Sequence, residues 1–298
     1  MQPPSIPSVR RARAARRAFR QAAARAAAAA LAAAGLAVLA WPCTAPAAPA
    51  RSAPSGPARG LSTDRPDRTE SPITVAPGRV QVEADLLGVH RDRDGGSETR
   101  AVRAGHVNLK LGVHRRADLQ LVVPAWTRVR LRGGAAPDLT REGFGDVAVR
   151  VKVNLAGSEG PPALAVMPFV ALPTAAAGLG AGAVEGGLIV PAALDLPAGV
   201  GLGLMAQVDA AREEASGARR LDVSASAVLS RVLAGPLAAF VEVWGQRAGR
   251  GAAPWTGTFD AGLTLGVGPD AQLDAGVQAG LTRASEDLAA FIGLSVRR

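Results

Sequence analysis

Residues 146–155 read DVAVRVKVNL, and every second residue of this stretch is apolar. The valines at positions 147, 149, 151 and 153 and the leucine at 155 alternate with Asp, Ala, Arg, Lys and Asn. A period of two residues is that of a β-strand with one apolar and one polar face. The same alternation recurs in block after block from residue 79 to the C-terminus. It predicts an all-β protein, either a sandwich or a barrel.

The first 50 residues lack this alternation and have the layout of a secretory signal peptide. Seven arginines lie between Arg10 and Arg25, an apolar run covers residues 26–39, and Ala48-Pro49-Ala50 follows. The apolar run is too short for a good membrane span, so we expect export and cleavage after residue 50. Cys43 lies within this segment, so the mature chain contains no cysteine and forms no disulfide.

Removal of the signal peptide changes the charge of the chain. The full sequence has a formal charge of +9, and the loss of seven arginines leaves +2 on 248 residues. No basic stripe is interleaved with aromatic residues, so we expect no nucleic acid as a partner. A mature chain of this length fits one barrel or one large sandwich. No stretch of 18 apolar residues follows residue 50, which excludes a helical membrane protein.

Twelve strands are expected, and the connections between them form two alternating classes. One class is short, as at residues 114–116 and 234–235, and the other is generally longer and more polar, as at residues 93–98 and 133–144. Short turns at one end and longer loops at the other are typical of an antiparallel transmembrane barrel in an outer membrane. The even strand count puts both termini at the short-turn end. The expected strands are residues 79–92, 99–114, 117–132, 145–156, 163–174, 183–196, 199–213, 219–233, 236–247, 255–267, 271–284 and 287–297.

Within each strand, the position parity separates a lipid-facing set of side chains from a lumen-facing set. Leu119, for example, would face lipid and Gln120 the lumen, while Trp126, Trp244 and Trp255 lie near the loop-side strand ends, where an aromatic girdle belongs. The charged residues expected in the lumen are Glu83, Asp85, Lys110, Arg128, Arg130, Arg150, Lys152, Glu185, Asp209, Asp222, Glu242, Asp260 and Asp274. These residues either pair with one another to brace the interior or line a track for a substrate.

Residues 51–78 precede the first strand and contain five prolines and no alternation. One interpretation is a periplasmic leader whose charges are only solvated. The alternative is a plug that folds into the barrel and pairs with lumen charges such as Arg128, Arg150 and Lys152. A twelve-stranded barrel is intermediate between side-chain-filled and open barrels, so a plugged or narrow pore fits. The charged residues of this motif are Asp64, Arg65, Asp67, Arg68 and Glu70.

The stretch TDRPDRTESPITVAPG at residues 63–78 resembles the opening of the bacterial MetA-pathway-of-phenol-degradation family. Further segments match in order, at residues 145–155, 163–175, 184–199, 202–212 and 272–295. The resemblance covers essentially the whole mature chain. It implies an outer-membrane β-barrel transporter associated by name with the catabolism of aromatic compounds, and hence residence in the outer membrane of a Gram-negative bacterium.

The expected organisation is a signal peptide at 1–50, a proline-rich charged segment at 51–78 and a barrel at 79–298. The expected partners are outer-membrane lipid, the barrel-assembly machinery and small apolar or aromatic solutes.

No enzyme activity, cofactor or metal is expected. No elbow motif positions a nucleophilic serine. His106 and His114 would lie about 26 Å apart along one strand, too far to chelate one metal ion. Two functions remain open. One is a channel for uptake or efflux of small apolar or aromatic compounds, and the other is a closed barrel with a structural or receptor-like role.

Overall fold

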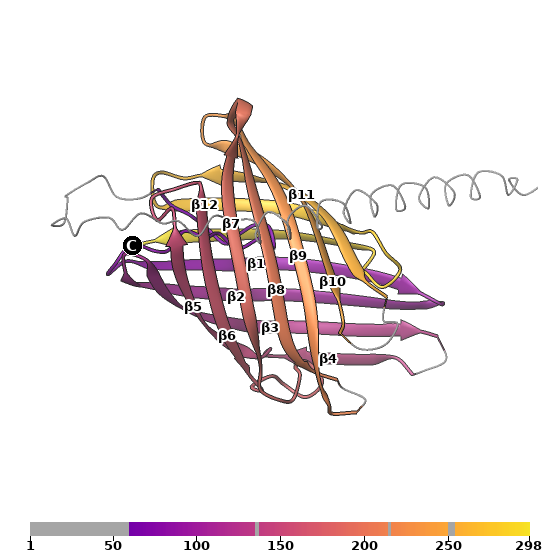
Figure 1. Ribbon diagram of the computed structural model, residues 1–298. Coiled ribbons are helices and arrows are strands. Elements are labelled where there is room, and N and C mark those ends of the chain that lie inside the picture. The colour runs from indigo at the N-terminus through magenta and orange to yellow at the C-terminus, as the bar shows by residue number, and fades with distance from the viewer. Residues whose placement is uncertain (1–59, 135–136, 214–215, 250–253) are drawn as a thin grey trace, which may run out of the picture.

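The computed structural model describes residues 60–134, 137–213, 216–249 and 254–298 (Figure 1). The expected signal peptide at 1–50 and residues 51–59 lie outside the described residues. Neighbouring strands pair antiparallel, and β1 also pairs with β13, which closes the sheet into a barrel. The strands are β1 (Val80–Asp94), β2 (Ser97–His114), β3 (Ala117–Gly133), β4 (Leu139–Gly143), β5 (Val147–Ala156), β6 (Ala163–Leu172), β7 (Glu185–Leu196), β8 (Val200–Arg212), β9 (Arg219–Ala234), β10 (Leu237–Arg247), β11 (Thr256–Gly266), β12 (Ala271–Gly280) and β13 (Leu288–Arg297).

The prediction of a twelve-stranded antiparallel barrel is confirmed, and each expected strand ends within four residues of its observed bounds. The expected loop at 133–144 is different, because it contains the additional short strand β4. This strand pairs with residues 127–131 of β3, whereas β5 pairs only with residues 117–122 of β3. Without β4, the loop-side half of β3 would be an unpaired edge with free backbone hydrogen-bonding groups.

The connections follow the expected rhythm with one exception. The expected loop at 93–98 is instead a two-residue turn, since β1 and β2 continue to Gly95 and Gly96, both with positive φ (55° and 89°). Glycine adopts this region readily, and such turns match the twist of a hairpin. Both ends of the barrel sequence lie at the short-turn end, where Gln81 pairs with Arg297.

The distribution of side chains is the reverse of that in a water-soluble protein. The largest fully buried side chains include Lys110, Lys152 and Glu242, whereas Leu119 and Leu121 are 41% and 39% exposed. Apolar residues therefore cover the outer wall, and charged residues fill the interior. This is the distribution that a barrel needs when lipid surrounds it. Among the described residues, no helix is long and apolar enough to span a membrane.

An irregularity shared by the first three strands reverses the parity of the residues beyond it. The pairing register of β1 with β13 shifts between Asp85 and Leu87. Leu86 and Leu87 are consecutive, yet both side chains are exposed. On β2, Gly105 has φ +66° at the same level. An extra residue in a strand turns every later side chain to the opposite face.

Arg128 and Arg130 consequently lie on the outer face, so the prediction that they face the lumen is wrong. They are paired across the sheet with Val102 and Arg100 of β2, on the same face as the exposed Val89 of β1. The expected aromatic girdle is also divided. Trp126 lines the same outer groove as Arg128, while Trp244 faces the lumen beneath Arg68.

We predict that Gly112→Ala destabilises the barrel. A Cβ atom at Gly112 would lie 2.0 Å from the carbonyl oxygen of Ala76, which belongs to the segment leading into β1. Backbone has to move to relieve that overlap, so the free energy of unfolding in urea and detergent micelles should fall by about 1–3 kcal/mol.

Gly266→Ala is the matched control in β11, since its nearest non-neighbouring atom would be 3.6 Å away, on Pro236. Equal stability of the two variants would contradict the close approach of the segment to β2.

Candidate functional site

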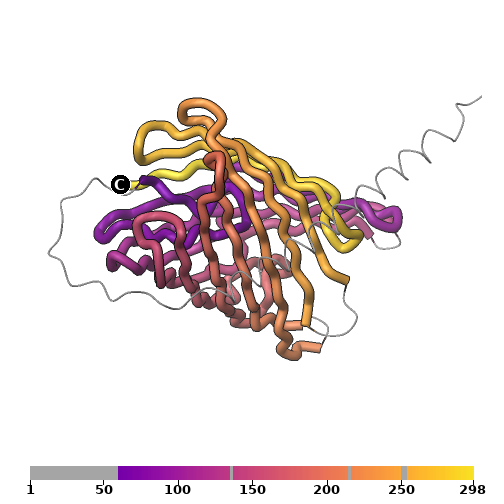
Figure 2. Tube along the Cα trace, turned by 45° about the horizontal axis from the view of Figure 1, so that its top comes forward, coloured from indigo at the N-terminus to yellow at the C-terminus, as the bar shows by residue number. Residues whose placement is uncertain are grey.

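Residues 60–78 run inside the ring of strands and form the candidate site (Figure 2). We refer to residues 63–76 as the inner segment. At the short-turn end, Gly78 donates its backbone N–H to the carbonyl of Gly112, at 2.8 Å. Further in, the backbone N–H of Val75 donates to Asp118, and Asn154 donates to the carbonyl of Pro72, each at 2.9 Å. The barrel side chains thus satisfy backbone groups that have no strand partner.

Asp64 is the centre of a buried ionic cluster. Its carboxylate contacts the ammonium group of Lys110 on β2 and lies 2.6 Å from that of Lys152 on β5. Its backbone N–H donates to Glu83 at 3.0 Å, and Glu83 also contacts Lys110. The backbone N–H of Ser71 donates to Asp64 at 2.9 Å, which folds the inner segment back on itself. Burial alone would raise the pKa of Asp64, but the two lysines outweigh it and hold that pKa well below its usual range.

The guanidinium of Arg65 connects the inner segment to the strands at which the barrel closes. It donates to both oxygens of Asp274 on β12, at 2.7 and 3.3 Å, and contacts Asp85 on β1. When a guanidinium donates two N–H groups to one carboxylate, the contact fixes its orientation in addition to neutralising its charge. Phe291 on β13 lies 6.0 Å from the same guanidinium.

Arg68 and Thr69 attach the next part of the segment to β10 and β11, which lie beside β12 in the ring. The backbone N–H of Arg68 donates to Glu242 at 2.9 Å, and the hydroxyl of Thr69 donates to the same carboxylate at 2.5 Å. The guanidinium of Arg68 lies 4.4 Å from the ring of Trp244 and 3.8 Å from Asp260. This distance to the ring is within the range of a cation–π interaction.

Two acidic residues of the inner segment are in a less favourable environment. Glu70 accepts a hydrogen bond from Arg150 at 2.6 Å, but burial and the nearby Asp64 raise its pKa to about 7. Burial and the nearby Glu242 raise the pKa of Asp67 well above its usual value. Both carboxyl groups therefore bind protons more readily than they would in water.

Eight of the thirteen residues expected in the lumen contact the inner segment. They are Glu83, Asp85, Lys110, Arg150, Lys152, Glu242, Asp260 and Asp274. Arg128, expected to be a partner of this segment, instead pairs with Glu142 of β4 at 2.6 Å. The sequence reasoning missed Asp118, Asn154 and Ser226, although they share the parity of Gln120, Lys152 and Ser224.

Glu185, Asp209 and Asp222 lie toward the loop-side end of β7, β8 and β9. Asp209 is directly opposite Asp222 in the ladder, and the guanidinium of Arg220 donates to Asp222 at 2.9 Å. Glu185 accepts the backbone N–H of Arg212 at 2.6 Å. Among the described residues, none of the three contacts the inner segment. Glu185 links β7 to β8, whereas Asp209 and Asp222 are like charges opposite each other on neighbouring strands.

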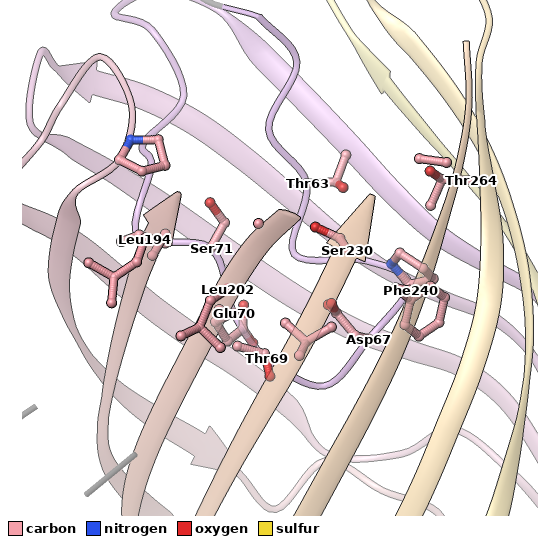
Figure 3. A pocket seen from close by; sticks show the side chains of 18 of the residues that line it. Thr63, Asp67, Thr69, Glu70, Ser71, Leu194, Leu202, Ser230, Phe240 and Thr264 are labelled. Carbon is pink, nitrogen blue, oxygen red and sulfur yellow. The ribbon is translucent and has the colours of Figure 1, made fainter. Parts of the chain in front are cut away.

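Two cavities lie on either side of the inner segment. The first, of about 330 Å³, is at the short-turn end, between the segment and strands β7 to β10, with Leu194, Leu202 and Phe240 on its wall (Figure 3). The second, of about 450 Å³, extends toward the loops and is lined by Trp244, Phe291 and charged side chains. Arg65, Pro66, Asp67 and Glu70 line both cavities, so this stretch separates them.

Within the described ranges, no group of three or more histidine, cysteine or acidic residues could hold a metal ion. His90 instead lies 2.8 Å from Glu286, and His106 is 3.8 Å from Asp85.

We predict that Asp64→Asn destabilises the folded barrel strongly. The substitution leaves the buried Lys152 without a carboxylate, and breaking one side of a buried ion pair typically costs about 3–5 kcal/mol. The double variant Asp64→Asn with Lys152→Met should recover much of that loss, because no uncompensated ammonium remains.

Urea unfolding in micelles gives the free energies, and the exposed Asp195→Asn is the charge-matched control. Additive effects of the two substitutions would show that the pair is not coupled.

Comparison with known proteins agrees with this architecture. The model of the family described as "Putative MetA-pathway of phenol degradation" matches residues 63–297. No curated protein matches the chain.

Among solved structures, the chain is similar to the COG4313 outer membrane channel from Pseudomonas putida F1. The identity is 13% and the TM-score 0.57, covering 80% of this chain and all of that one. It also matches the NanC porin, with 10% identity, a TM-score of 0.48 and coverage of 73% and 98%. The family match takes in both the inner segment and the barrel wall. The chain therefore has the β-barrel fold of that outer membrane channel and belongs to the family described as "Putative MetA-pathway of phenol degradation".

Proposed function

We propose that the protein is a channel for small molecules in the outer membrane and that its inner segment controls passage. The observation that carries this proposal is the position of residues 65–70 between two lumen cavities. A solute that crosses the barrel has to pass this stretch. A segment held by side chains on many strands, rather than by strand pairing, can shift without opening the wall.

The cavity walls favour small solutes with apolar or aromatic parts. Met205, Trp244 and Phe291 line the loop-side cavity, and Val228 and Phe240 line the other. Each cavity also has polar side chains that orient a ligand, which is typical of sites for small organic molecules. The family description, which refers to phenol degradation, supports the same class of solute.

We further propose a role for each part of the chain. Residues 1–50 direct export and are removed, residues 51–78 form the segment that enters the lumen, and residues 79–298 form the wall. The barrel-assembly machinery inserts this wall into lipid. Transport, and not catalysis, is the proposed activity, because eight of the charged lumen residues are engaged in contacts with the inner segment.

Deletion of residues 63–76 should raise single-channel conductance in planar bilayers severalfold, since it joins the two cavities. Because the deletion also leaves Lys110 and Lys152 without Asp64, the deletion should be made in the Lys110→Gln, Lys152→Gln background, with the full-length double variant as its control. Unchanged conductance would show that the segment does not obstruct the pore. Folded protein that is silent in bilayers and in liposome swelling, with and without the segment, would favour a closed structural or receptor-like barrel.

Channel opening should increase as pH rises from about 5 to about 8. Glu70, with a pKa of about 7, faces Asp64, Arg150 and Lys152, and Asp67 is also shifted upward. The docked segment thus binds more protons than the undocked one, so docking is strongest at low pH and weakens as pH passes the raised pKa. Asp64 stays ionised throughout this range.

The fraction of time that single channels are open measures this effect. Glu70→Gln should flatten the pH dependence, whereas Glu159→Gln at a short turn should not. A Glu70→Gln variant with the original pH profile would exclude Glu70 as the titrating group.

A further inference from the structure

The loop-side parts of β1, β2 and β3, at residues 87–94, 97–104 and 126–133, form an extension beyond the irregularity. We infer that the outer face of this extension binds the phosphorylated headgroup of a lipid in the outer leaflet. The parity reversal at Gly105 carries this inference, because it turns a row of arginines outward. Arg91, Arg100 and Arg130 stand directly opposite one another on three adjacent strands. Like charges in such positions repel one another, so this arrangement favours a bound anion.

The next rows of the same face add three more arginines. The whole cluster consists of Arg91, Arg93, Arg100, Arg128, Arg130 and Arg132. Three carboxylates oppose it within the described residues. Glu98 lies 2.5 Å from Arg91 and is also bonded to Arg93 and Arg100. Glu142 pairs with Arg128, and Asp138 is 3.9 Å from Arg132.

Three positive charges are thus left without a carboxylate of their own. No ion pair is formed by Arg130 among the described residues. Because guanidinium groups match the geometry of phosphate oxygens, this surface suits a phosphorylated ligand.

The same face provides a surface for the acyl part of a lipid. Four arginines of the cluster line a groove of about 560 Å³ together with Val89, Val102, Leu288 and Trp126; they are Arg91, Arg100, Arg128 and Arg130. Val89 and Leu288 are 47% and 52% exposed, and they continue the apolar outer wall. An amphiphile fits this combination, since its chains can lie on the valines and leucine while its headgroup meets the arginines.

The height of the cluster agrees with the position of headgroups. Tryptophans on the outer face of barrels mark the boundary between hydrocarbon and headgroups. Arg130 follows Trp126 by four residues on β3, which is about 13 Å further toward the loops. The extension projects beyond the ends of neighbouring strands in Figures 1 and 2, so its outer surface stands beside the headgroup layer.

The test measures binding of diphosphoryl lipid A to the full-length, folded protein in uncharged detergent by native mass spectrometry. The Arg91→Ala, Arg100→Ala, Arg130→Ala triple variant should bind at least about tenfold more weakly, because several charge-assisted contacts are lost. The matched control is Arg115→Ala, Arg116→Ala, Arg231→Ala, three exposed arginines at the short-turn end, which should bind as the unmodified protein does. Circular dichroism and single-channel conductance, both expected to be unchanged, verify that each variant is folded.

Two further ligands distinguish the sources of affinity. Lipid A without phosphates should bind weakly to every variant; if it binds as tightly as the diphosphoryl form, the inference is overturned. Inorganic phosphate alone should compete poorly. If it occupies the arginine row as tightly as the lipid, the surface is a site for a free anion and the lipid proposal fails. Equal binding of diphosphoryl lipid A to the two triple variants would likewise overturn it.

Discussion

The pairing of Asp64 with Lys110 and Lys152 is the interaction on which the rest of the interior depends. Both ammonium groups are almost completely buried, and a buried charge without a partner costs several kcal/mol. Among the contacts of the described residues, Asp64 is the only carboxylate bound to Lys152. The wall therefore does not balance its own charges at this level. It requires the segment that precedes it in the chain, and the segment requires the wall for its backbone donors.

The same complementarity extends around the barrel. Arg65 is bound by β1 and β12, Arg68 and Thr69 by β10 and β11, and Glu70 by β5. No single one of these contacts closes the pore. Together they hold a short irregular segment between the two cavities, and the raised pKa values of Glu70 and Asp67 show where that attachment is weakest. The strong anchor at Asp64 and the weak one at Glu70 are six residues apart. This spacing allows the middle of the segment to move while its base stays attached.

The strand period predicted the wall well, because each side chain's face depends only on local parity. The expected bounds and inward positions such as Lys110, Lys152 and Glu242 follow from this rule. Sequence separation explains what was not predicted. Arg65 and Asp274 are 209 residues apart, and only the closure of β1 on β13 brings them together. The charges of the inner segment were visible in the sequence, but their partners were set by the ring.

The wrong prediction that Arg128 and Arg130 face the lumen has a different origin. One irregular residue in a strand turns every later side chain to the opposite face, so position parity no longer predicts the face beyond it. Gly105 is a small residue in a chain rich in glycine, so composition did not distinguish it from glycines in regular strands. The physical outcome is nevertheless consistent. Before the irregularity, polar side chains face a lumen that needs charge; beyond it, arginines face outward at a level where lipid gives way to headgroups. The bulge thus allows one set of strands to satisfy two different surroundings along its length.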